Sequence, residues 1–395
     1  MSSDPTPFAP TTTALNRFRE VASYFLRLGL TAFGGPAAHM ALMHHEVVEK
    51  RKWVDEQKFL DLLGTANLLP GPSSTEMAIF LGYMRAGWPG LIAGGVCFIL
   101  PAMLMVILLA WIYQQGQTLP FTGWVMTGVK PVVIAIVFQA LWTLGKKAVK
   151  NWPLGTAGLV VILLYLVGVN VIGLLLGAGV LIMVIENRKR IRLSSKLSAI
   201  TPIIFAQTFL NQYLPAINPL LFSLPLLFLE FLKIGAVLFG SGYVLLAFLR
   251  FDLVTQYHWL TDKQLLDAIA IGQVTPGPVF TTATFIGFLL GGVPGALLST
   301  LAIFLPAFFY VAISGPFISK IRQSSWAGCF LDGVNVASLG LMAGVIIQLG
   351  QSSLTDPISI TIGIVSALIL FRLKVNPTWL ILGGAIFGVL KGMLL

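Results

Sequence analysis

Long apolar segments separated by short polar ones make up most of the chain. Residues 91–112, 131–143 with their flanks, and 157–185 are apolar over lengths typical of bilayer-spanning helices. Glycine and proline interrupt several other apolar segments, which shortens the helices that can form there. The pattern predicts an all-α polytopic membrane protein in which some helices are broken at membrane depth.

The interruptions occur twice, 206 residues apart. In the first copy a Phe-Gly-Gly-Pro break at 33–36 is followed by a Pro-Gly-Pro turn at 70–72. In the second copy Phe-Gly-Ser-Gly at 239–242 is followed by Pro-Gly-Pro at 276–278. Matched helix breaks in a duplicated membrane unit are the best sequence indication of a transport site.

Basic residues predict the relative orientation of the two copies. They gather in short loops, as expected for loops on the cytoplasmic side. Four matched loops are basic in only one copy each: 50–52 and 146–150 in the first, and 320–322 and 372–374 in the second. We therefore expect two inverted-topology repeats, which require one additional crossing between them.

The expected organisation has four parts. Residues 1–15 form a disordered head without the features of a cleaved signal peptide. The first repeat covers 16–196, a linking crossing covers 197–221, and the second, inverted repeat covers 222–395. Within the first repeat, residues 55–85 form a re-entrant hairpin with its tip at Pro-Gly-Pro, because each of its helices is too short for a hydrocarbon core of about 30 Å.

Composition supports a membrane protein and argues against other classes. Of 395 residues, 56% are hydrophobic and 10% are charged, whereas soluble domains carry about 25% charged residues. The net charge of +10 is accounted for by the loops, so no nucleic-acid partner is expected. Cys97 and Cys329 lie in or beside apolar segments and are expected to pack there. No His or Cys spacing indicates a metal site or another cofactor.

The helix starts after the Pro-Gly-Pro turns are candidate binding elements. A helix that begins at membrane depth presents free N–H groups and a positive dipole end, which suit an anion. The first copy offers Ser73, Ser74 and Thr75 there, and the second offers Thr281 and Thr282. The breaks could instead be simple kinks and packing points. Four breaks matched in pairs favour one central binding site.

Glycines at the breaks allow the backbone to approach a ligand closely. The candidates are Gly34, Gly35 and Gly71 in the first copy, and Gly240, Gly242 and Gly277 in the second. Asn67 and Gln273 each precede a Pro-Gly-Pro turn by three residues. Their amides either donate to an oxyanion or cap the preceding helix.

Charged side chains within apolar segments are the next candidates. Arg27 and Lys233 are matched by the repeat, and both would suit an anionic ligand. The alternative is that they extend to the membrane interface. Lys130, whose counterpart is Asn335, is a third candidate cation.

Glu76 has two interpretations. It completes a Ser73-x-x-Glu76 capping box, or it titrates and couples transport to protons. Its counterpart, Thr282, cannot titrate, so a coupling role would be asymmetric.

The remaining polar residues are expected outside the site. Asp61 and Asp267 are expected on the polar faces of short helices in structural roles. The histidines without metal-ligand spacing are expected at solvated or interfacial positions: His39, His44 and His45.

The chain resembles the chromate ion transporter family in its long, two-domain form. The resemblance is carried by the Phe-Gly-Gly-Pro break at 33–36, the segment Trp-Val-Asp-Glu-Gln-Lys-Phe-Leu-Asp at 53–61, Asn-Leu-Leu-Pro-Gly-Pro at 67–72 and the duplicated layout, whereas Phe-Gly-Ser-Gly at 239–242 departs from the family motif. The resemblance implies a secondary transporter in the bacterial inner membrane. It would export chromate from the cytoplasm by alternating access and confer chromate resistance. The second copy departs from the motif, since Val279 and Phe280 stand where the first copy has Ser73 and Ser74.

Two alternatives remain open. One is a transporter of the same fold for sulfate or another oxyanion, because chromate and sulfate are both tetrahedral dianions. The other is a membrane-embedded enzyme, for which no nucleophile or cofactor constellation is apparent. The expected partners are chromate, alternatively sulfate, membrane lipids and a second copy in a homodimer.

Overall fold

The computed structural model describes residues 13–116, 120–188, 222–239, 242, 244–314, 325–373 and 375–394. The expected linking crossing lies entirely outside these residues, as does most of the expected N-terminal head. Regular secondary structure in the described part is helical throughout, which confirms the all-α class. Among the described residues, five helical stretches are long and apolar enough to cross a membrane.

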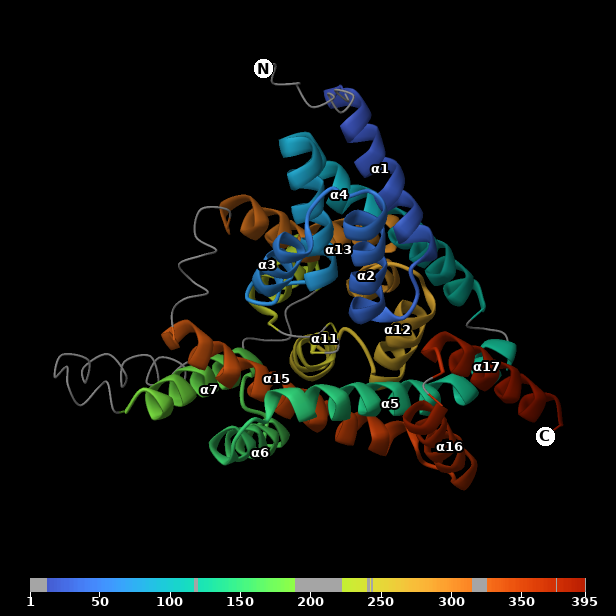
Figure 1. The fold of residues 1–395 in the computed structure, drawn as a ribbon. Helices are drawn as coiled ribbons and strands as arrows, with labels where there is room; N and C mark the ends of the chain where they lie inside the picture. Colours follow the sequence, from blue (N-terminus) through green and yellow to red (C-terminus); the bar gives the residue numbers. More distant parts are fainter. Residues whose placement is uncertain are drawn as a thin grey trace, which may run out of the picture.

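The two halves contain matching helices in the same order, and the second half has an additional 3₁₀ turn before its folded helix (Figure 1). The first half contains α1 (Ala14–Thr31), α2 (Gly35–His44) with a π-helical turn (His45–Lys50), α3 (Glu56–Ala66), α4 (Ser73–Gly116), α5 (Pro120–Ala148), α6 (Trp152–Leu166) and α7 (Val171–Glu186). The second half contains α10 (Leu224–Val237), α11 (Leu245–Leu249) with a π-helical turn (Arg250–Gln256), α12 (Asp262–Val274), a 3₁₀ turn (Val279–Thr281), α13 (Thr282–Ser314), α15 (Ser325–Ser353), α16 (Pro357–Leu373) and α17 (Pro377–Leu394).

Local sequence signals explain where the short helices begin and end. Helix α1 stops before Gly34, whose φ of +104° favours glycine, and Pro36 follows in the first turn of α2. Asp55 caps α3 by accepting a 2.7 Å hydrogen bond from the Lys58 N–H. Thr261 and Gln264 form a capping box at the start of α12. The breaks therefore lie where glycine and proline predict them.

Helices α4 and α13 are each folded back on themselves. Gly87 (φ +64°) and Gly292 (φ +62°) interrupt them with non-helical backbone at matched positions. In α4, the two arms approach so closely that a Cβ on Gly90 would clash with the backbone of Gly82. The 44-residue α4 is therefore an antiparallel helical hairpin, with a short first arm and a longer second arm.

The long helices exchange partners between the halves. Helix α5 packs against α16 and α17 of the second half, whereas α15 packs against α6 and α7 of the first half. Close approach depends on glycine: a Cβ on Gly384 would lie 2.7 Å from the Gly128 carbonyl oxygen. We call α5–α7 with α15–α17 the exchanged layer, and α1–α4 with α10–α13 the broken-helix layer. In Figure 1 the exchanged layer lies below α1–α4 and α13.

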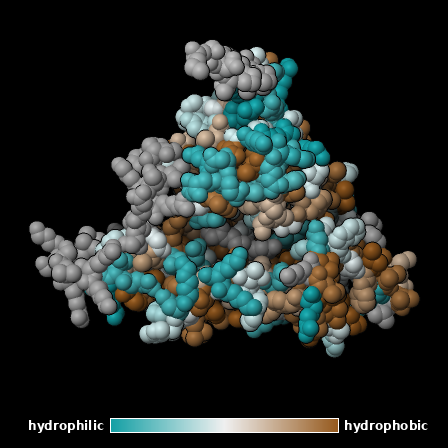
Figure 2. Space-filling view, in the orientation of Figure 1, coloured by the Kyte–Doolittle hydropathy of each residue, from teal (hydrophilic) through white to brown (hydrophobic). Residues whose placement is uncertain are grey.

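The outer surface carries large apolar side chains suited to lipid. On α17, Trp379 is 69% exposed and Ile386 is 62% exposed. Figure 2 shows hydrophobic surface gathered over the region of α16 and α17, and hydrophilic surface over α2 and α3. Exposed apolar area of this extent is expected where helices face hydrocarbon rather than water. The chain is therefore a multi-pass membrane protein.

Replacing Gly90 with valine tests the α4 hairpin. Because the added side chain would meet the Gly82 backbone, we expect a loss of about 1–3 kcal/mol or more of folding stability. Fluorescence-detected gel filtration of detergent extracts should show little folded Gly90→Val protein. The matched control is Gly123→Val in α5, where a Cβ would meet open space. Equal yields of the two variants would contradict the hairpin packing.

Candidate functional site

The two Pro-Gly-Pro turns each contact the helix break of the other half. The Gly71 N–H donates a 2.7 Å hydrogen bond to the Leu238 carbonyl, at the end of α10. The Gly277 N–H donates a 2.9 Å hydrogen bond to the Ala32 carbonyl, at the end of α1. Since the donors and the acceptors are matched by the repeat, these two bonds form a reciprocal pair. The structure thus brings together breaks that are distant in the sequence.

The two turn glycines both contact the folded helix of the other half, and the contact at Gly277 is the tighter one. Gly71 and Gly277 have φ values of +137° and +93°, which favour glycine. A Cβ on Gly277 would lie 2.8 Å from the Ala102 Cβ, and one on Gly71 would lie 3.8 Å from the Ala307 Cβ. The two alanines are also matched by the repeat. Each turn therefore packs between the first helix and the folded helix of the other half.

The start of α4 carries buried polar groups without partners. Ser74, Thr75 and Glu76 are 3%, 0% and 0% exposed. The Thr75 hydroxyl and both Glu76 carboxyl oxygens have no hydrogen-bond partner. A Cβ on Gly71 would lie 2.7 Å from Glu76 Oε1, so the carboxyl group is directly beside the turn. The capping-box interpretation of Glu76 is therefore wrong, because its carboxyl group does not bond to the helix terminus.

The matched helix start in the second half is different. Thr281 donates its hydroxyl to the Pro278 carbonyl at 2.8 Å, and Thr282 donates to the Val279 carbonyl at 2.9 Å. Both hydroxyls therefore bond to the backbone of their own turn. Among the described residues of the two helix starts, buried polar groups without a hydrogen-bond partner occur only in the first half.

The two matched cations lie in unlike surroundings. Arg27 is on an exposed face of α1. Lys233 forms ion pairs with Glu230 and, at 3.0 Å, with Asp252. The structure therefore does not place them as an equivalent buried pair.

Lys130 is paired with an acid of the other half. Its ammonium lies 3.3 Å from Asp267 Oδ1, and Tyr113 donates a 2.7 Å hydrogen bond to Asp267 Oδ2. Asp267 is fully buried, and the Lys130 side chain is 13% exposed. Asp267 therefore does not lie on a polar face of its helix, as the sequence suggested, but in a buried ion pair between the halves.

His39 does not lie at the solvated or interfacial position that the sequence suggested. It is 0% exposed and donates from Nε2 to the Ala32 carbonyl at 3.1 Å, the carbonyl that also accepts from Gly277. Its place in the first turns after the Phe-Gly-Gly-Pro break was the available signal. His44 and His45 lie in an exposed network with Glu49, and the hydrogen bond from His45 lowers the pKa of the Glu49 carboxyl.

The other predicted ligands are spread around the breaks. Gly34 and Asn67 are exposed, Gly35, Ser73 and Gln273 are half-buried, and Gly242 is buried. Gly240 lies outside the described residues.

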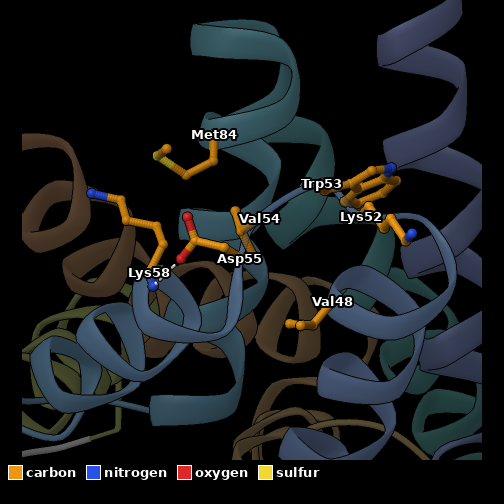
Figure 3. A pocket seen from close by; sticks show the side chains of 7 residues that line it. All are labelled: Val48, Lys52, Trp53, Val54, Asp55, Lys58 and Met84. Atoms are coloured by element: carbon orange, nitrogen blue, oxygen red, sulfur yellow. Dashed lines mark hydrogen bonds between the residues drawn. The ribbon is translucent and has the colours of Figure 1, made fainter.

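An open pocket of about 520 Å³ lies away from these groups (Figure 3). Figure 3 shows the ammonium groups of Lys52 and Lys58 on opposite sides of it. They do not converge on one point, and Asp55 is engaged in capping α3. None of the predicted ligands lines this pocket, whose residues are Val48, Lys52, Trp53, Val54, Asp55, Lys58 and Met84.

A multi-pass helical membrane protein with paired helix breaks that meet between its halves is the class that the structure defines. The chain belongs to the chromate transporter family, whose model matches residues 19–183 and 226–389. It is 37% identical to the chromate transport protein of Cupriavidus metallidurans, over 98% of this chain and 95% of that relative.

Other relatives cover nearly the whole chain as well. A probable chromate transport protein of Synechococcus elongatus is 33% identical over 94% of this chain and 95% of its own length. An uncharacterized transporter of Methanocaldococcus jannaschii is 28% identical over 95% and 94%. No solved structure gives a significant match. Membership of a transporter family implies a protein that is not an enzyme.

Replacing His39 with leucine tests its role at the break. Loss of the buried N–H removes one of two donors to the Ala32 carbonyl. We expect destabilisation of about 1–3 kcal/mol and a lower melting temperature in detergent. His44→Leu, at a partly exposed position, is the control. A His39 variant as stable as the His44 variant would show that the bond contributes nothing.

Proposed function

We propose that this protein exports chromate from the bacterial cytoplasm across the inner membrane by alternating access and so confers chromate resistance. The reciprocal pair of hydrogen bonds between turns and breaks is the observation that carries the proposal. Broken helices that meet between two repeats are the usual setting of a transporter site. Relatives named as chromate transport proteins support the substrate.

In this proposal the two halves are inverted-topology repeats. The short first arms of α4 and α13, together with α3 and α12, are re-entrant hairpins with their tips at the Pro-Gly-Pro turns. The inversion is supported by the four matched loops that are basic in only one of the two copies, because basic loops are expected on the cytoplasmic side. The short lengths of α3 and α12, 11 and 13 residues, support the re-entrant assignment. The division of the sequence into repeats and a linking crossing, and a homodimer, stay predictions.

The oxyanion binds where the turns and breaks meet. In the structure the N–H groups of Gly71 and Gly277 are bonded to the opposite half. Separation of a turn from its break would free that N–H for the oxyanion, beside the hydroxyls at the two helix starts. The proposed ligands are Gly34, Gly35, Asn67, Gly71, Ser73, Ser74, Thr75, Gly240, Gly242, Gln273, Gly277, Thr281 and Thr282, with Arg27, Lys130 and Lys233 offsetting the charge.

The movement takes place within the broken-helix layer. The exchanged packing of α5 and α15 ties the halves together, so the halves do not separate as independent bodies. Instead, α1–α4 and α10–α13 move relative to each other on the exchanged layer, which separates turns from breaks and opens the site to each side in turn. Movement of one rigid body against another around a fixed site is the usual form of alternating access.

Glu76 carries the coupling proton in this scheme. An ionised carboxylate without partners is costly at a fully buried position, so the group is neutral when enclosed. Opening to water would allow Glu76 to ionise and to exchange its proton.

Valine at Gly71 or Gly277 should abolish chromate resistance. The side chain would be strained by the positive φ at either turn and would clash with Glu76 at Gly71 and with Ala102 at Gly277. Glutamine at Arg27 or Lys233 should lower resistance because it removes a positive charge. Growth on chromate is compared with the amount of each variant in the membrane. Gly145→Val, where a Cβ meets open space, is the control. Full resistance in all four variants would contradict the proposed site.

Flux in vesicles separates the two substrate hypotheses. Transport of labelled chromate that excess sulfate fails to reduce would support chromate as the substrate. Transport of sulfate without transport of chromate would instead identify sulfate as the substrate.

Glu76→Gln should separate exchange from coupling. A permanently neutral side chain is expected to preserve chromate counterflow in proteoliposomes but to remove the acceleration by an imposed pH gradient. Glu46→Gln in the π-helical turn after α2 is the matched control. Unchanged acceleration in the Glu76 variant would exclude Glu76 as the proton carrier.

A further inference from the structure

The matched helices α3 and α12 are not in equivalent surroundings. Leu266 of α12 is 1% exposed, whereas Leu60, at the same position of α3, is 44% exposed. Helix α12 packs against α5, α15 and α17 of the exchanged layer. The apolar core of α10–α13 is continuous with that layer, whereas α1–α3 belong to a separate cluster. The broken-helix layer is therefore docked on the exchanged layer through its second half.

A polar cluster lies within this docked contact. Lys130 of α5 pairs with Asp267 of α12, and Tyr113 of α4 donates to the other carboxyl oxygen. Lys263 of α12 is a further cation, and its positive charge repels the Lys130 ammonium. The remaining contact is apolar, because Val133, Leu266 and Ile269 line a common small cavity between the helices. The Lys130–Asp267 pair is thus the charged attraction between α12 and α5 in the described residues.

The repeat does not provide this pair on the other side. Asp61 matches Asp267, but Asn335 stands at the position of Lys130. Docking of α3 on the exchanged layer would therefore lack the ion pair. The sequence therefore makes docking of α12 on the exchanged layer electrostatically different from docking of α3 on it.

We propose that the Lys130–Asp267 pair holds α12 against α5 and that the transported tetrahedral dianion releases α12 by taking Lys130 from Asp267. The inference rests on the proposed function and assigns Lys130 a second role. Lys130 pairs with Asp267 while α12 is docked, and it pairs with the dianion once α12 is released. A dianion offers Lys130 more negative charge than a single carboxylate. Tyr113 stays hydrogen-bonded to Asp267, so the buried carboxylate keeps a donor after Lys130 leaves.

Hydrogen exchange of α12 measures the release. The full-length protein in nanodiscs is compared in sodium chromate and in sodium chloride of equal ionic strength, and chromate binding is measured by equilibrium dialysis. In the wild type, chromate should raise amide exchange in 262–274 several-fold. In Lys130→Gln, exchange should be high already and should not respond to chromate. A merely structural ion pair would give no response to chromate in the wild type.

Two further variants make the result specific. Lys150→Gln removes the exposed pair that Lys150 forms with Asp332, at 2.8 Å, and should respond to chromate like the wild type. Tyr113→Phe should raise amide exchange in 262–274 without chromate but keep the increase that chromate causes. This variant replaces Lys130→Gln in the experiment if Lys130→Gln does not fold. Chromate binding with unchanged α12 exchange would overturn the inference and leave the proposed function standing. Absence of chromate binding would overturn both.

Discussion

The structure depends on satisfying backbone hydrogen-bonding groups where helices are broken. A carbonyl left at a helix end has no water partner in hydrocarbon, so protein must supply the donor. Here Gly277 donates to the Ala32 carbonyl alongside His39, and Gly71 donates to the Leu238 carbonyl. Each break therefore takes a backbone donor from the other half. The two halves must therefore meet at the breaks, and that meeting places the candidate site between them.

The exchanged layer meets the same requirement by different means. Its helices have no break of the Pro-Gly-Pro kind and form most of their backbone hydrogen bonds internally, so their packing depends on shape. Gly128 and Gly384 allow α5 and α17 to approach closely, as small residues generally do between membrane helices. Because α5 and α15 each pack on helices of the other half, the layer joins the two copies. It provides a common surface on which the broken-helix layer docks through α12.

Similar backbones carry unlike chemistry in the two halves. Glu76 lies unpartnered where Thr282 bonds to its own turn, and Lys130 pairs with Asp267 where Asn335 offers no charge. The duplicated breaks explain how the chain reaches a paired geometry. The unmatched side chains explain how one site can have two different sides. Transport direction and coupling are properties of that difference in our proposal.

Most of the helix boundaries were predictable because their signals are local. Glycine, proline and capping residues act on the few residues around them, so the break at Gly34 and the ends of the helices within 55–85 follow from the sequence. Side-chain partners were less predictable. The burial of His39 and the absence of a capping box at Glu76 depend on groups supplied by other elements.

The sequence by itself determined the membrane class, the duplicated unit and the positions of its breaks, since hydrophobic length and backbone-restricting residues act locally. Only the tertiary structure decided which copy satisfies which break, that α5 and α15 exchange partners, and that Lys130 meets Asp267. These contacts join residues more than a hundred positions apart in the chain. Their energies depend on burial and distance in three dimensions, which no local pattern contains.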